Sequence, residues 1–130
     1  MKFLGVDYGI KRIGIATSDE DGKLAFPQST ILNDSKTFKR LEDVFKNSGA
    51  KEIVVGESVN RSGEPNALSA RIEVFIKKKK KRFGVPVRKQ KEFFTTVEAR
   101  KSPGNKSMAD AKAAALILQR YLDKKNKNKV

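Results

Sequence analysis

The sequence predicts an α/β domain built on a five-stranded mixed sheet flanked by helices, with three antiparallel strands first and parallel βαβ connections after them. Three observations lead to this fold class. Short apolar segments joined by turn residues open the chain, later apolar strands alternate with segments of helical periodicity, and 130 residues suit one domain. We expect the domain over residues 1–123 and a basic, disordered tail over 124–130.

The first half of the chain predicts three strands, a helix and a fourth strand. Strands are expected over 2–8, 12–18 and 24–32, with an Asp-Gly turn closing the segment 19–22 and Pro27 favouring a sheet edge or a bulge. Cap-forming residues at 33–35 precede a helix whose apolar residues include Leu41, and Gly49 ends it. The apolar run 52–56 is typical of a buried parallel strand.

The second half predicts a helix from about 66 to 83, ended by Gly84, and a fifth strand beginning at 85–87. Thr95 or Thr96 would open a short helix ending near Ser102, followed by a flexible basic loop over 101–107. A final helix is expected over 108–123. Right-handed crossovers would place these helices on both faces of the sheet.

The composition excludes several kinds of chemistry. The chain has no Cys and no His, which excludes disulfides, thiolate or imidazole zinc sites and Ser-His-Asp triads. Its net charge of +14 predicts a polyanionic partner, with nucleic acid ahead of anionic membrane. The apolar start is too short for a signal peptide, and no stretch approaches the roughly 20 apolar residues of a membrane helix. We therefore expect a cytoplasmic protein with no membrane partner.

Two acidic residues follow strands expected to be parallel neighbours. Asp7 ends the first strand beside Gly5 and Gly9, whose missing Cβ atoms would let a phosphate or a metal approach the backbone. Glu57 follows the strand 52–56, so it would lie at the same rim of the sheet. The alternatives are a turn Asp bonded to local N–H groups and a solvated loop Glu.

Two further acidic residues could reach the same rim. Glu92 follows the fifth strand, although an acid there could also serve a helix start. Asp110 shares a helix face with Ala113 and Ala114, which should pack on the sheet, although Ser107 and Asp110 also have the spacing of a capping box. Together, four carboxylates without His or Cys are the set that a two-metal phosphodiesterase would use, with two Mg²⁺ or Mn²⁺ ions about 4 Å apart.

Basic residues near these acids are candidates to hold substrate phosphates. Lys11 and Arg12 lie beside Asp7, and Lys101 and Lys106 lie in the basic loop before the last helix. The run 77–81 with Arg82 is as consistent with a solvated helix end as with phosphate contact.

Several motifs resemble those of the YqgF/RuvX family over nearly the whole chain and in the same order. They are Gly5-x-Asp7-x-Gly9-x-Lys11-Arg12-Ile13-Gly14-Ile15-Ala16, then 53–56, Asn60-x-x-Gly63, Glu92-x-x-Thr95-Thr96-x-x-Ala99, and Asp110-x-x-Ala113-Ala114-x-x-Ile117-Leu118. The resemblance implies a ribonuclease-H-like fold and a metal site whose family acids map onto Asp7, Glu92 and Asp110. It also adds Asn60 to the nucleic-acid-binding candidates.

The sequence departs from the family at two places. Lys91 and Phe93 stand where the family has Asp and Arg, and Glu57 stands where the common pattern has an apolar residue. Related junction resolvases place a catalytic Glu after this strand, so we hypothesise that Glu57 is a metal ligand here. Full nuclease activity of Glu57→Gln would contradict that hypothesis.

The resemblance implies a metal-dependent nuclease, with processing of the 5′ end of the pre-16S ribosomal RNA as the first candidate function. A Holliday junction resolvase, which would need two sites and hence a dimer, is the alternative. The altered segment at 91–93 leaves a catalytically inactive nucleic-acid-binding module open. A phosphotransferase or ATPase of the actin–sugar-kinase type would share an Asp-x-Gly start, but the chain looks too short for it. The partner is thus a ribosomal RNA precursor or branched DNA, and the protein is a monomer or a homodimer.

Overall fold

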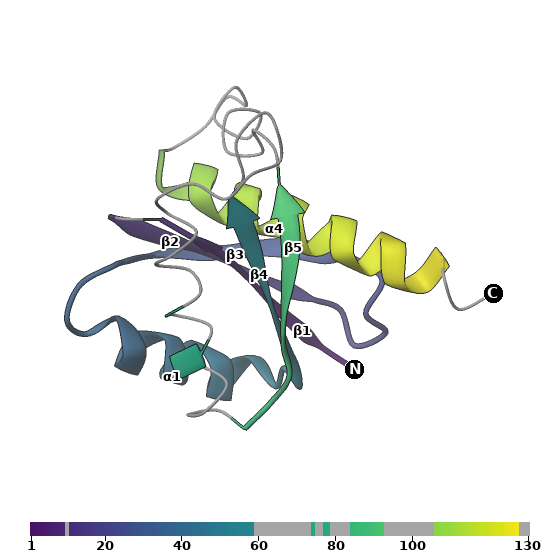
Figure 1. Cartoon of the computed structure of the whole chain (residues 1–130), viewed down its shortest axis with the longest axis horizontal. Helices are drawn as coiled ribbons and strands as arrows, with labels where there is room; N and C mark the ends of the chain where they lie inside the picture. The colour runs from purple at the N-terminus through teal and green to yellow at the C-terminus, as the bar shows by residue number, and fades with distance from the viewer. Residues whose placement is uncertain (10, 59–73, 75–76, 79–83, 93–105, 128–130) are drawn as a thin grey trace.

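The computed structural model describes residues 1–9, 11–58, 74, 77–78, 84–92 and 106–127. Its five strands form one sheet in the order β3-β2-β1-β4-β5 (Figure 1). The strands are β1 (Phe3–Tyr8), β2 (Arg12–Ser18), β3 (Ala25–Leu32), β4 (Glu52–Ser58) and β5 (Val87–Glu92). β1 pairs with β2, and β2 with β3, in antiparallel fashion, whereas β1–β4 and β4–β5 are parallel. The predicted mixed sheet is therefore confirmed.

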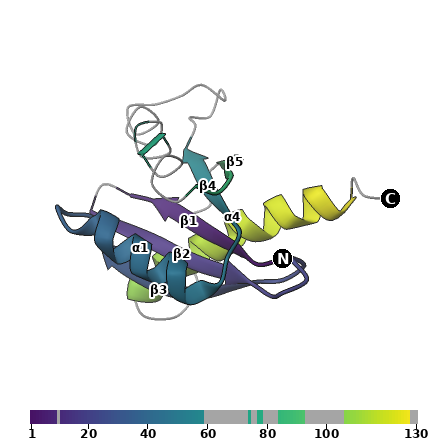
Figure 2. The same cartoon turned by 90° about the horizontal axis from the view of Figure 1, so that it is seen from below.

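Two helices cover opposite faces of this sheet. α1 (Thr37–Ser48) lies on one side and α4 (Lys106–Lys127) crosses the other (Figure 2). The sheet separates two apolar cores because alternate residues of a strand point to opposite faces. One core joins Leu41 of α1 to Leu4, Val6 and Val55 of the sheet. The other joins Leu118 and its neighbours on α4 to the opposite face of the same strands.

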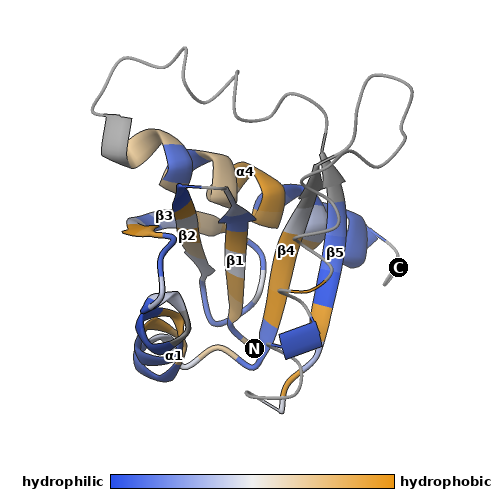
Figure 3. Cartoon of the chain, turned by 60° about the vertical axis from the view of Figure 1, so that its left-hand side comes forward, coloured by the Kyte–Doolittle hydropathy of each residue, from blue (hydrophilic) through white to orange (hydrophobic). Residues whose placement is uncertain are grey.

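The hydropathy pattern follows this layered arrangement. In Figure 3, β1 and β4 are largely apolar, whereas β5 is mostly hydrophilic. This difference fits the sheet order, because β1 and β4 are interior strands and β5 forms an edge. β3 forms the other edge of the sheet, as expected from the presence of Pro27 in this strand. The pairing shifts there from Ile15–Ser29 to Ala16–Pro27, which leaves Gln28 as the extra residue of a bulge.

The predicted turn residues adopt the expected backbone conformations. Gly22 has φ +67° in the hairpin turn, and Gly49 has φ +73° at the end of α1. Gly84, which was expected to end a helix, has φ +65°. Of the helix expected over 66–83, the described residues 74, 77 and 78 are helical, and the others lie outside the described part. The whole segment 93–105, including the expected short helix, also lies outside it.

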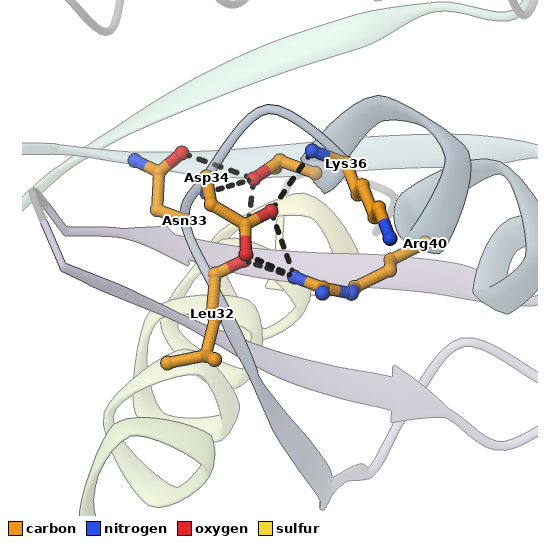
Figure 4. A network of polar contacts seen from close by, with 6 residues as sticks. Leu32, Asn33, Asp34, Lys36 and Arg40 are labelled. Atoms are coloured by element: carbon orange, nitrogen blue, oxygen red, sulfur yellow. Dashed lines mark hydrogen bonds and ion pairs between the residues drawn. The ribbon is translucent and has the colours of Figure 1, made fainter.

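The start of α1 corrects the predicted cap. The N-cap position is Lys36, without a side-chain cap bond, rather than one of the residues 33–35. Asp34 instead accepts a hydrogen bond from the Lys36 backbone N–H at 2.8 Å and forms an ion pair with Arg40 at 2.9 Å (Figure 4). A carboxylate two residues before the N-cap can still organise the turn. The cap-forming residues therefore predicted correctly where α1 begins, but none of their side chains caps the helix.

Several other boundaries differ from the prediction: β1 and β3 each begin one residue later than expected, and β4 continues to Ser58 instead of ending at 56. β5 begins at Val87, the last of the three residues expected to open it, and α4 begins at Lys106 rather than 108. α4 also continues to Lys127, so the expected tail boundary at 124 was too early. Lys125 packs over the Phe3 ring at 4.7 Å, and Asn126 donates a hydrogen bond to the Gly22 carbonyl. These contacts of α4 with β1 and with the turn before β3 explain why the helix extends past the apolar pattern. Among the described residues, no helix is long and apolar enough to cross a membrane.

Candidate active site

Three glycines on neighbouring strands allow α4 to lie directly on the sheet. They are Gly5 of β1, Gly14 of β2 and Gly56 of β4. A Cβ on Gly5 would lie 2.8 Å from the Leu118 Cβ, and one on Gly56 would lie 2.5 Å from Ile117 Cδ1. A Cβ on Gly14 would overlap the backbone carbonyl of Asp110. Since real Cβ atoms need more room, any other residue would hold the helix farther from the sheet.

This arrangement corrects the role predicted for two glycines. Gly5 was expected to leave space for a ligand, but Leu118 fills that space. A Cβ on Gly9 would overlap the Arg12 carbonyl, so Gly9 permits the tight connection between β1 and β2. The sequence alone indicates no such role for Gly14 or Gly56, because their neighbours on α4 are remote in sequence.

Asp7 and Asp110 meet at Gly14. Asp7 pairs with Gly14 across β1 and β2, and the Asp110 backbone covers Gly14. Phe3 and Gly5 face α4, so the alternation of β1 places Asp7 on the same side of the sheet. The half-buried Asp7 and the buried Asp110 therefore come from opposite ends of the chain to one neighbourhood. The backbone thus brings these two acids near each other, and a shared metal site for their carboxylates stays a prediction.

The carboxylate of Asp110 lies close to Arg12 at the start of β2. The Arg12 Nε lies 3.0 Å from Asp110 Oδ2, with the Asp110 side chain 11% exposed and that of Arg12 43% exposed. Even so, Oδ2 is buried without a hydrogen-bond donor among the described residues. The two observations agree if the Arg12 N–H points away from Oδ2, so that charge attraction holds the pair without a well-aligned hydrogen bond.

The strand register places the backbones of Glu57 and Glu92 at the same rim of the sheet. The register of β1 and β4 ends at Val6–Val55. Glu57 was expected to follow β4 but lies within it, next to its last residue Ser58. In the next pair of strands, Glu57 pairs with Lys91 and Ser58 pairs with Glu92. Parallel strands end at a common edge, so the topology carries both residues to the edge where β1 ends. The side chains of Glu57 and Glu92 lie outside the described part of the structure.

The structure describes some of the candidate phosphate-binding residues and not others. Lys11 is exposed, directly before Arg12. Its backbone carbonyl accepts a hydrogen bond from the Asn33 N–H at 2.9 Å, while Asn33 Nδ2 donates to the Gly9 carbonyl at 2.8 Å. This loop is thereby tied to the segment before α1. Lys106 begins α4, but its side chain is not described, and Asn60 and Lys101 lie outside the described residues.

The donor atoms present fit a divalent hard cation. Mg²⁺ and Mn²⁺ prefer carboxylate oxygens, and Asp110 Oδ2 is buried without a hydrogen bond beside the strand that carries Asp7. Within the described residues, no group of three or more acidic side chains is close enough to hold a metal ion. Asp7 and Asp110 are among these described residues, whereas the side chains of Glu57 and Glu92 are not.

Comparison with known proteins identifies the family. The family model described as "RuvX: Holliday junction resolvase" matches residues 1–124. The chain belongs to the RuvX family. A RuvX relative from Lawsonia intracellularis, named "Putative pre-16S rRNA nuclease", is 36% identical and covers 100% of this chain and 99% of its own length. A relative of the same name from Nitratidesulfovibrio vulgaris is 32% identical over 95% of this chain and 94% of its own.

Solved structures give the same fold. The structure of Thermus thermophilus RuvC superposes on this RuvX chain with a TM-score of 0.63 at 16% identity, covering 98% of this chain and 97% of that one. The same protein in complex with a Holliday junction substrate gives a TM-score of 0.62 at 17% identity, covering 98% and 96%. The predicted ribonuclease-H-like fold is thus confirmed. The predicted nuclease class agrees with the family match and with the names of the relatives.

Proposed function

We propose that this RuvX chain is a divalent-metal-dependent nuclease that processes the 5′ end of the pre-16S ribosomal RNA in the cytoplasm. The observation that carries the proposal is the absence of a side chain at Gly14. It lets the backbone of the buried Asp110 lie against the residue that pairs with Asp7. The names of the relatives support the RNA substrate. Hydrolysis of a single precursor strand needs one site, so a monomer suffices.

The carboxylates of Asp7 and Asp110 would hold the cation, and Glu57 and Glu92 would complete the set for two ions. When bound, Mg²⁺ or Mn²⁺ supplies the Lewis-acid chemistry that phosphodiester hydrolysis needs, through activation of water and stabilisation of charge on the leaving oxygen. Burial of Asp110 keeps its carboxylate in a fixed position and limits competing water. Lys11 and Arg12, at the same edge, would bind the phosphate on either side of the cleaved bond.

A cleavage assay tests this function directly. Purified protein is incubated with a pre-16S RNA fragment and, separately, with a four-way DNA junction, with Mn²⁺ and with EDTA. We expect Mn²⁺-dependent cleavage of the RNA. Asp7→Asn and Asp110→Asn should each lower the rate at least roughly a hundredfold, because a catalytic cation contributes several kcal/mol and about 1.4 kcal/mol corresponds to a tenfold rate change. Equal cleavage by the wild type and both variants would contradict the proposal.

Junction resolution is the second candidate, favoured by the description of the matching family model. The same assay separates the two, because a resolvase would cut the junction in preference to the RNA and would require two copies of the chain. The departures at Lys91 and Phe93 leave open a third outcome, in which the chain binds nucleic acid without cleaving it. An inactive binding module would retain salt-sensitive affinity for nucleic acid and show no Mn²⁺-dependent cleavage.

A further inference from the structure

The contact between Arg12 and Asp110 has two properties that distinguish it from a permanent structural ion pair. The Arg12 side chain is 43% exposed, so its guanidinium can turn toward solvent without unpacking a core. Its N–H also leaves Asp110 Oδ2 without a hydrogen bond, although the two atoms are only 3.0 Å apart. A buried permanent pair would need well-aligned hydrogen bonds to offset the cost of removing both charges from water.

The buried carboxylate nevertheless needs a positive charge beside it. Removal of Arg12 with nothing in its place would leave the Asp110 charge in an environment that penalises it. A divalent cation at the same oxygen would supply that charge more strongly. Since a guanidinium and a metal ion repel each other and compete for one carboxylate, the site favours one of them at a time.

We propose that Arg12 occupies Asp110 in the metal-free protein and leaves it when a divalent cation binds, which frees its guanidinium for a substrate phosphate. This inference rests on the proposed metal site and adds a regulatory role for Arg12. It follows that cation and nucleic acid bind with positive coupling: the cation releases Arg12 for the phosphate, and the phosphate draws Arg12 away from the cation's ligand. Coupling of this kind must be equal in both directions.

Binding measurements test the proposal without relying on cleavage. The Mn²⁺ affinity of the wild type and of Arg12→Gln is measured by electron paramagnetic resonance, with and without a short phosphorothioate RNA that resists hydrolysis. Arg12→Gln should bind Mn²⁺ roughly five- to tenfold more tightly than the wild type in the absence of RNA. RNA should tighten Mn²⁺ binding to the wild type by a similar factor and to the variant by a smaller one.

Matched variants separate this role from general effects of charge and stability. Arg40→Gln removes an arginine that also pairs with an aspartate, at 2.9 Å, but lies at α1 and should leave Mn²⁺ binding unchanged. Arg12→Lys keeps the positive charge and should retain part of the coupling between Mn²⁺ and RNA. It provides the test if Arg12→Gln folds poorly. In the Asp110→Asn background, Arg12→Gln should no longer tighten Mn²⁺ binding, because the shared ligand is gone.

The outcomes distinguish this inference from the proposed function. If the wild type and Arg12→Gln bind Mn²⁺ equally and show equal coupling to RNA, the inference is overturned while the metal-dependent nuclease stands. If neither protein binds Mn²⁺, the inference and the proposed metal site are overturned together. Mn²⁺ binding by Arg12→Gln alone would support the inference and show that Arg12 blocks the site in the free protein.

Discussion

Gly14 is the residue on which the position of Asp110 depends. It lies in β2 opposite Asp7, and its missing side chain leaves the space that the Asp110 backbone occupies. The sequence motif contained Gly14 without revealing this purpose, because nothing local shows which part of the chain covers the strand. For the same reason the Arg12–Asp110 pair was not predicted, although Asp7 and Asp110 themselves were identified as candidates from their strand and helix positions.

Replacement of Gly14 by Ala should therefore damage the site and the fold together. The added Cβ would overlap backbone rather than a flexible side chain, so α4 must shift. We expect a loss of roughly 1–3 kcal/mol in the free energy of unfolding, the usual cost of overpacking. We also expect Mn²⁺ binding at least tenfold weaker under conditions where the variant is folded. Urea unfolding and Mn²⁺ titration measure the two effects.

Gly49→Ala is the matched control for this prediction. Gly49 has φ +73° with open space around its Cβ position, so the substitution strains only the end of α1. It should cost about 1–2 kcal/mol of stability through the left-handed backbone conformation and leave Mn²⁺ affinity unchanged. If Gly14→Ala bound Mn²⁺ as well as Gly49→Ala does, the close approach of α4 would not be what forms the site.

At the scale of elements, periodicity and turn residues predicted most of the secondary structure, and long-range contacts decided the rest. β2 has the bounds expected from its apolar alternation, and Gly49 ends α1 as expected. α4 was predicted too short because Lys124 to Lys127 have no apolar pattern of their own. Their helical conformation is supported by Lys125 over the Phe3 ring and by its ion pair with the buried Glu52 at 3.8 Å.

The start of α1 gives a prediction about pH. The Lys36 backbone N–H, and after it the Arg40 guanidinium, hold the pKa of Asp34 below its ordinary value of 3.8. A carboxyl whose pKa is lower in the folded state stabilises the fold above its unfolded pKa, and this stabilisation is lost as the pH falls through the folded pKa. Asp34→Ala should therefore lower the melting temperature at pH 7, and its difference from the wild type should shrink as the pH falls below about 3.8.

Thermal melts between pH 7 and pH 2.5 followed by circular dichroism would measure this difference. Asp21→Ala, in the exposed hairpin turn, serves as the comparison and should show a small difference at every pH. A constant gap between wild type and Asp34→Ala across that range would indicate that the carboxylate charge does not stabilise α1.

At the scale of the whole molecule, charge determines the kind of partner. A chain of 130 residues with 29 basic and 15 acidic residues repels itself unless it binds a polyanion. The excess of basic over acidic residues gives the chain a net charge of +14, which attracts phosphates. This part of the function followed from composition alone, whereas the choice between RNA and junction DNA depends on surface shape that composition does not encode.

Salt dependence tests this electrostatic contribution. In EDTA, where cleavage is blocked, the affinity for a pre-16S RNA fragment is measured by fluorescence anisotropy at two potassium chloride concentrations that differ fourfold. If about four phosphates are contacted, the affinity should fall roughly a hundredfold. An affinity that does not change with salt would show that the basic surface does not bind the backbone of the nucleic acid.

α4 also has a consequence for how the sequence of such a protein can vary. One helix carries Asp110 near its start, Leu118 against Gly5 in its middle and Lys125 over Phe3 near its end. Each residue inserted into a helix turns everything before it by about 100° relative to everything after it. With a single insertion between Asp110 and Leu118, the apolar residues from Leu118 onward would still pack on the sheet. The Asp110 carboxylate would be rotated away from Asp7. Changes in length among related chains should therefore fall in loops, and this helix should be inherited as an uninterrupted unit.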